Sequence, residues 1–177
     1  SNRTPRFASK GKAGAERWLA IELKLIADIG LVGLPNAGKS SLLGQLSAAH
    51  PKIGDYPFTT LEPQLGVIRN RYHDPYIIAD IPGLIEGAHQ GSGLGHAFLK
   101  HVERTSIIMH VIDISDDRYQ QNFQIIEHEL WQYRAELKER VKLVVLNKID
   151  MVDPEMVLEI EQFFRNKGFL TSCVSAL

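Results

Sequence analysis

Cysteine is scarce in this 177-residue sequence, and long apolar runs and an excess of charge of either sign are missing. Its single cysteine, Cys173, cannot form a disulfide within the chain, which fits a reducing compartment. No apolar run approaches the ~20 residues of a membrane-spanning helix, and the basic, polar residues 1–14 are not followed by the apolar stretch of a signal peptide. The 20 basic and 21 acidic residues disfavour a nucleic-acid surface over the whole domain. We therefore expect a cytoplasmic protein that does not enter a membrane.

Hydrophobic residues make up 44% of the chain, enough for one domain with a proper core. Apolar runs and helix-like segments alternate from residue 26 onward. The predicted strands are Ile26–Leu34, Gln64–Tyr72, Tyr76–Ile81, Ser106–Ile114, Val141–Leu146 and Phe169–Ser175. The predicted helices are Lys39–Ala49, Gly95–Arg104, Gln120–Arg140 and Pro154–Lys167.

This alternation predicts a three-layer α/β fold around a mostly parallel, six-stranded sheet. Only His73, Asp74 and Pro75 separate the second and third predicted strands. A connection that short requires a hairpin, so one strand should run antiparallel to the others. We expect residues 1–15 to be a linker or the remnant of a preceding domain, and residues 16–177 to form the domain.

A glycine-bounded segment follows the first predicted strand and opens the first predicted helix. It consists of Gly33, Leu34, Pro35, Asn36, Ala37, Gly38, Lys39, Ser40 and Ser41. Strand, glycine-rich loop and helix are the context of a P-loop, whose backbone N–H groups and helix N-terminus bind phosphates. Lys39 would reach the β- and γ-phosphates, and the Ser40 hydroxyl would ligate Mg²⁺. An ordinary β-α turn is the alternative, and these flanking segments disfavour it.

Two further segments bear on phosphate and metal binding. Asp80, Ile81, Pro82 and Gly83 end a predicted strand, where a carboxylate can hold a Mg²⁺-bound water and the glycine amide can approach the γ-phosphate. Alone, this sequence is also a good turn. A polar loop contains Thr59 and Thr60, one of whose hydroxyls would complete the Mg²⁺ shell, although β-branched filler is the simpler interpretation.

The last two segments point to a base. Asn147, Lys148, Ile149 and Asp150 follow a predicted strand. The Asp150 carboxylate can accept hydrogen bonds from N1–H and the exocyclic amine of guanine, which adenine cannot offer, and this favours guanine. Asn147 would brace the loop and the Lys148 stem would lie across the base. A backbone amide in the closing stretch would contact guanine O6. That stretch is Ser175, Ala176 and Leu177.

In order, these segments resemble the five motifs of a Ras-like GTPase, and the longer strings around them resemble the Obg family of ribosome-associated GTPases. Those strings are ELKLIADIGLVGLPNAGKSSLL, YPFTTLEPQLGV and DIPGLIEGAHQGSGLGHAFLKHVERT. The resemblance implies that residues 33–40 bind phosphates and that Ser40 and Thr60 ligate Mg²⁺. Switch I would comprise Phe58, Thr59, Thr60, Leu61 and Glu62, and Asp80–Gly83 would open switch II. Asn147–Asp150 and Ser175–Leu177 would hold guanine.

Three departures qualify the resemblance. The glycine-rich N-terminal domain of Obg proteins is absent, and the chain ends at the last guanine motif, so we expect an excised, monomeric G domain. Leu84 occupies the position of the water-orienting glutamine of Ras-type enzymes. By resemblance to other GTPases that lack this glutamine, Asn36 would ligate a catalytic K⁺, although it would equally serve as a turn residue.

The expected function is Mg²⁺-dependent binding and slow hydrolysis of GTP to GDP and phosphate. Lys39, Thr60 and Gly83 are the expected catalytic residues, with Asn36 as the K⁺ ligand. The resemblance implies a nucleotide switch in assembly of the large ribosomal subunit and in growth control, with sensing of guanosine tetraphosphate. A nucleotide-gated binding module with negligible turnover is the alternative, which Leu84 favours in part.

Overall fold

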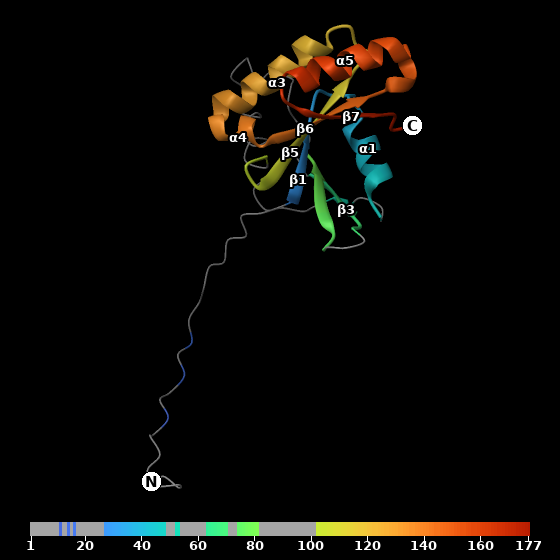
Figure 1. The fold of residues 1–177 in the computed structure, drawn as a ribbon. Coiled ribbons are helices and arrows are strands. Elements are labelled where there is room, and N and C mark those ends of the chain that lie inside the picture. The colour runs from blue at the N-terminus through green and yellow to red at the C-terminus, as the bar shows by residue number, and fades with distance from the viewer. Residues whose placement is uncertain are drawn as a thin grey trace, which may run out of the picture.

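A computed structural model describes residues 11, 14, 16, 27–48, 52–53, 63–70, 74–81 and 102–177 of the chain (Figure 1). Its strands are β1 Ala27–Val32, β2 Lys52–Ile53, β3 Gln64–Ile68, β4 Tyr76–Asp80, β5 Thr105–Asp113, β6 Val141–Asn147 and β7 Leu170–Val174. Its helices are α1 Lys39–Leu46, α3 Tyr119–Tyr133, α4 Ala135–Glu139 and α5 Pro154–Asn166, with a 3₁₀ turn η2 at Ile149–Met151. Among these residues no helix is long and apolar enough to cross a membrane.

Within the described residues the strands form one sheet in the order β2-β3-β4-β1-β5-β6-β7. Pairing is parallel from β4 through β1, β5, β6 and β7. β3 is antiparallel both to β4 and to β2, so it is the one reversed strand. The α/β fold and the predicted hairpin are therefore confirmed. All six predicted strands are present, and the two-residue β2 adds a seventh that is too short to give a periodic signal.

Helices cover both faces of the sheet, which gives the three predicted layers (Figure 1). On one face α1 packs Leu42 and Leu43 against Leu31, Ile78 and Val111. On the other, the buried side chains of α3, α4 and α5 pack against β5 and β6; they are Phe123, Ile126, Leu130, Leu137, Ile160 and Phe164. Strands buried on both faces explain the continuous apolar runs in the sequence.

The predicted helix Gln120–Arg140 is wrong as a single element, because α3 and α4 are separate helices. The chain becomes extended at Arg134, with φ −155° and ψ 124°. This break lets Leu137 of α4 reach the core, where it is fully buried. Arg134 also forms an ion pair with Glu103. Helical periodicity continues through the break, so the sequence pattern does not reveal it.

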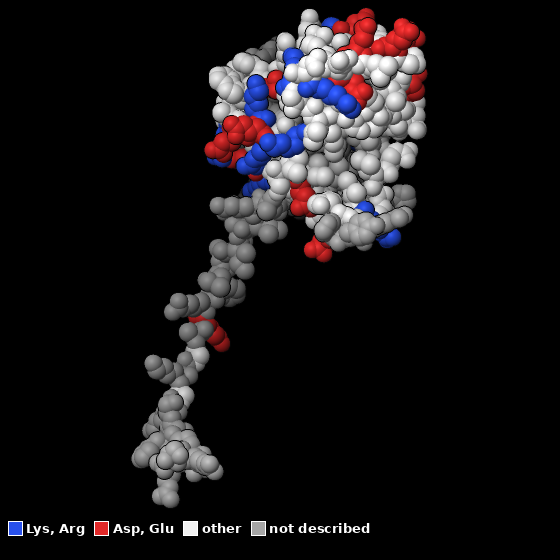
Figure 2. All heavy atoms as spheres, viewed as in Figure 1, with Lys and Arg blue, Asp and Glu red and all other residues white. Residues whose placement is uncertain are grey.

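Other predicted ends differ from the structure by a few residues. Helix α1 ends at Leu46 rather than Ala49, and β3 ends at Ile68 rather than Tyr72. The predicted helix Gly95–Arg104 lies outside the described residues except for its last three. Figure 2 shows basic and acidic side chains intermingled over the face that carries α3, α4 and α5, which is no broad basic surface.

Candidate nucleotide-binding site

The glycine-rich loop connects β1 to α1 at the carboxyl edge of the sheet. A Cβ on Gly33 would lie 2.3 Å from the Val111 carbonyl oxygen, and one on Gly38 would lie 2.1 Å from the Asn147 side-chain nitrogen. Gly38 also has a φ of 92°, which side chains rarely tolerate. Glycine is therefore required at both positions to pack the loop against β5 and β6.

A hollow of about 310 Å³ opens above this loop and is lined by Asn36, Gly38, Lys39, Ser40, Ser41 and Lys148. The Lys39 ammonium donates hydrogen bonds to the carbonyls of Gly33 and Leu34, each at 3.0 Å. Burial lowers the pKa of Lys39, and the nearby Asp80 charge opposes that shift. The hollow thus offers a lysine whose only acceptors in this structure, among the described residues, are the loop's own carbonyls.

Ser40 and Asp80 meet beside this hollow. The Ser40 hydroxyl donates to Asp80 Oδ2 at 2.5 Å. Asp80 is 5% exposed, and its other carboxylate oxygen, Oδ1, is buried without a hydrogen-bond partner among the described residues. A buried carboxylate oxygen without a partner is costly unless something else satisfies it. Hard oxygen donors of this kind suit Mg²⁺, so the two residues fit the predicted metal.

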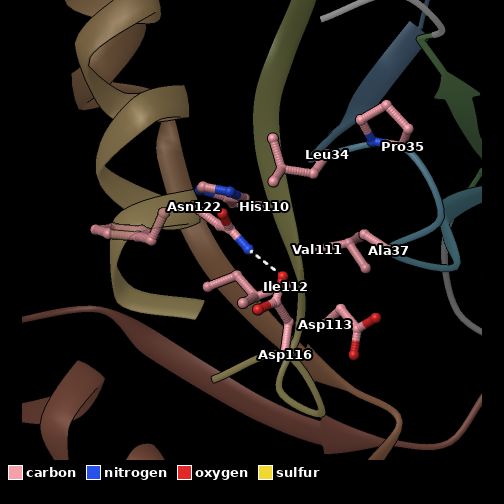
Figure 3. Close-up of a pocket in the computed structure, with 10 residues that line it drawn as sticks. Leu34, Pro35, Ala37, His110, Val111, Ile112, Asp113, Asp116 and Asn122 are labelled. Atoms are coloured by element: carbon pink, nitrogen blue, oxygen red, sulfur yellow. Dashed lines mark hydrogen bonds between the residues drawn. The ribbon is translucent and has the colours of Figure 1, made fainter. Parts of the chain in front are cut away.

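Not every predicted residue of the P-loop lines the 310 Å³ hollow above it, which is called the phosphate hollow below. Leu34, Pro35 and Ala37 line a separate cavity of about 50 Å³ behind the loop (Figure 3). The Ile81 side chain is buried in the core, so only its backbone remains for a ligand. The predicted residues Phe58, Thr59, Thr60, Leu61, Glu62, Pro82 and Gly83 lie outside the described residues, as does Leu84.

A second hollow of about 200 Å³ lies beside the first. It is lined by Gly38, Ser41, Asn147, Lys148, Asp150, Met151, Ser175, Ala176 and Leu177. Both predicted guanine segments therefore meet at one place, and Gly38 joins them to the phosphate-binding loop. Ile149 packs its side chain against the core beside α5 instead of lining the hollow.

Asn147 ties the three segments together. Its side-chain nitrogen donates to the Ala37 carbonyl at 2.8 Å, and its Oδ1 accepts from the Ala176 backbone N–H at 3.2 Å. The predicted bracing role of Asn147 matches this geometry. Because the Ala176 backbone N–H donates to Asn147 Oδ1, that N–H is not free to contact a base in this structure.

Two residues near the loop have no place among the predicted motifs. His110, on β5, is 1% exposed, stacks on Phe123 with ring centroids 4.9 Å apart, and lines the cavity of Figure 3. Burial, aided by the Lys39 charge, lowers the pKa of His110 to about 3. Asp113, the last residue of β5, contacts Lys148. An acidic residue ending an apolar strand was the available sequence signal for Asp113.

The fold and these two adjoining hollows define a P-loop GTPase domain. A model of the 50S ribosome-binding GTPase family matches residues 28–148. The chain therefore belongs to the 50S ribosome-binding GTPase family.

Relatives named GTPase Obg agree with the predicted resemblance to the Obg family and confirm it. The protein of Desulfotalea psychrophila is 65% identical over 153 residues, covering 86% of this chain and 41% of the relative. That of Aquifex aeolicus is 53% identical over 181 residues, covering all of this chain and 53% of the relative. The chain thus spans about half of the length of these relatives.

Solved structures show the same fold. Era, in complex with MgGDPNP and nucleotides 1506–1542 of 16S ribosomal RNA, aligns with a TM-score of 0.63 at 26% identity, over 84% of this chain and 50% of Era. The G domain of the FeoB iron transporter of T. maritima aligns with a TM-score of 0.59 at 19% identity, over 84% of this chain and 86% of that domain. The second likeness supports the fold alone.

Proposed function

We propose that this chain binds GTP together with Mg²⁺, hydrolyses it slowly to GDP and phosphate, and acts as a nucleotide switch. The observation that carries the proposal is the Ser40–Asp80 pair at the mouth of the P-loop, with a buried Asp80 oxygen that has no partner in the described part of the chain. A carboxylate and a hydroxyl beside a lysine-bearing glycine loop make a site for a metal-bound polyphosphate.

Ser40 and Asp80 would hold Mg²⁺, Ser40 directly and Asp80 through water, and Thr60 is proposed as a further ligand. When bound, the ion neutralises charge on the β- and γ-phosphates. A phosphate entering the loop competes with the Gly33 and Leu34 carbonyls for the Lys39 ammonium. Burial lowers the pKa of Lys39, and phosphate binding would raise it, because a nearby anion favours the charged lysine.

Base selection rests on Asp150 at the rim of the second hollow. Its carboxylate accepts hydrogen bonds from the guanine edge, while Asn147 keeps the loop and the segment after β7 at a fixed separation. With the base held there, the phosphates extend past Gly38, which lines both hollows, toward Lys39 and Ser40. This direction follows the order of the two hollows along the edge of the sheet.

For the catalytic step we propose a K⁺ ion held by Asn36, since Leu84 cannot orient a water. Asn36 lines the phosphate hollow and has a left-handed φ of 63°. By resemblance, the γ-phosphate would hold Thr60 and Gly83, and hydrolysis would release both switches. The family match supports a role with the large ribosomal subunit. From the resemblance to the Obg family alone, we further propose that this role is cytoplasmic and regulated by guanosine tetraphosphate.

Calorimetric titration with GTP, GDP and ATP, each with and without Mg²⁺, tests the binding half of the proposal. We expect guanine nucleotides to bind and ATP not to bind. Ser40→Ala should raise the Mg²⁺ concentration needed for GTP binding, whereas Ser172→Ala, the same change on β7, should not. Equal binding of ATP and GTP would contradict the proposal.

Phosphate release, measured with and without purified large ribosomal subunits, tests the catalytic half. Slow turnover of the chain alone supports an enzyme. Binding without turnover under both conditions would favour the alternative, a nucleotide-gated binding module.

A further inference from the structure

Asp113 and Lys148 form an ion pair where the two hollows meet. Asp113 is the last residue of β5 and lies in register with Asn147, the last residue of β6. Lys148 directly follows Asn147. The Lys148 ammonium contacts Asp113 Oδ2 at 2.5 Å, and the two side chains are 30% and 22% exposed. At that burial an ion pair is partly shielded from water, so it constrains the lysine more than a surface pair would.

The Asp113 carboxylate is fixed from its other side as well. Its Oδ1 accepts from the Ser115 backbone N–H at 3.0 Å and from the Ser115 hydroxyl at 2.6 Å. Partial burial acts to raise the pKa of Asp113, but the hydrogen bonds from Lys148 and Ser115 outweigh it and lower the pKa below the ordinary value. Asp113 is thus a charged anchor whose two oxygens are both occupied.

Lys148 has a left-handed backbone conformation, with a φ of 67°, that residues other than glycine rarely adopt. The residue lines both hollows, with Gly38 and Ser41 as the other residues common to the two. Its ammonium is held at Asp113. What remains for the hollows is therefore the four-carbon stem, which is apolar.

We propose that Asp113 is a positioning residue for nucleotide binding. By holding the ammonium, it presents the Lys148 stem as an apolar wall for the base and neutralises the charge of Lys148. Lys39 is then the lysine that serves the phosphates. The inference rests on the proposed binding of guanine nucleotides.

The test compares Asp113→Asn with Asp116→Asn, which makes the same change three residues away at a carboxylate bonded to Arg118 and Asn122. Affinities for GDP and for inorganic pyrophosphate are measured separately. We expect Asp113→Asn to weaken GDP binding about tenfold, without weakening pyrophosphate binding. Asp116→Asn should change neither.

A double variant isolates the contact. Lys148→Met keeps an apolar stem and removes the charge, so in that background Asp113→Asn should cost about twofold or less. Unequal losses in the two backgrounds, with intact pyrophosphate binding, support the proposal.

Three results would overturn it: unchanged GDP affinity in Asp113→Asn, an equal loss in both backgrounds, or a parallel loss of pyrophosphate binding, which indicates general loosening of the edge. A parent chain that binds no GDP would instead refute the proposed function.

Discussion

The second hollow, which contains Asp150 and is called the base hollow below, shares Gly38 with the phosphate hollow above the P-loop. The two differ in how their polar groups are hydrogen-bonded. At the base hollow, Asn147 forms hydrogen bonds with both the loop and the segment that follows β7, and Lys148 is paired with Asp113. At the phosphate hollow, within the residues that the structure describes, Asp80 Oδ1 has no partner and Lys39 donates only to loop carbonyls. The protein completes the first network itself and leaves the second for a ligand.

This difference predicts how substitutions divide. Buried groups that satisfy one another stabilise the fold, and losing one leaves its partner unpaired. Groups that wait for a ligand contribute to affinity and rate and carry little of the stability. Substitutions at the phosphate hollow should therefore alter nucleotide binding and turnover without changing the free energy of unfolding. Changes of pH or of monovalent cation should affect the two hollows differently.

Lys39→Ala gives the largest expected effect. The variant loses the cation that would contact the transferred phosphate, and GTP turnover should fall by about 10²–10³-fold. Its unfolding temperature should not fall, because a partly buried charge is removed. Phosphate release and thermal unfolding are measured on the same preparation. Normal turnover would refute the P-loop assignment. Loss of folding would show that Lys39, like Asn147, stabilises the fold through its bonds within the protein.

Asp150→Asn tests the other end. Replacing a charge-assisted acceptor should weaken GTP binding by about 2–3 kcal/mol. It should also shift preference toward xanthine nucleotides, since an amide donates to xanthine O2. Competition between GTP and xanthosine triphosphate measures this shift. If the variant retains the parent's GTP affinity, the base does not bind at Asp150.

Acid should act through His110, beneath the phosphate loop. Its folded pKa of about 3 lies below the ordinary value of 6.5. The unfolded chain therefore binds the extra proton first, so stability from the neutral histidine is full above pH 6.5 and falls as pH is lowered toward 3. Between pH 6.5 and 5 the loss should be about 2 kcal/mol. Denaturant unfolding of His110→Leu should show a correspondingly flatter pH dependence, and an unchanged slope would exclude His110 as the cause.

The smallest expected effect concerns monovalent cations. At equal ionic strength, K⁺ should raise GTP turnover severalfold over Na⁺, which is less than the ~10³-fold of an arginine finger. Asn36→Ala should erase the difference. Matched ionic strength is needed because screening alone alters phosphate affinity. Equal rates in both salts would leave Asn36 as a turn residue.

Much of this architecture followed from sequence because its signals are local. Buried parallel strands are continuous apolar runs, and the loop from Gly33 to Ser41 joins such a strand to a helix. Asn147 and Asp150 follow another strand of the same kind. The edge of the sheet that carries all three was predictable, since carboxyl ends of parallel strands meet there.

What escaped prediction depends on contacts between distant segments. The break at Arg134 is set by packing of Leu137 and by the ion pair with Glu103, and neither alters helical periodicity. Asp113 acquires its role only when β5 and β6 pair in register, and His110 reads as one more residue of an apolar strand. The residues of switch I, and Gly83 and Leu84 after Asp80, stay predictions because they lie outside the described residues.

The two hydrogen bonds of Asn147 also set a schedule for biosynthesis. One of them joins Asn147 to Ala37 in the phosphate loop, and the other joins Asn147 to Ala176, which comes much later in the sequence. A chain emerging at about 5–20 residues per second would expose the phosphate loop roughly 7–30 s before Ala176 appears. During that interval the nascent protein has its phosphate loop but lacks a complete base hollow. The base hollow that we propose to select guanine is therefore completed later in synthesis than the phosphate loop.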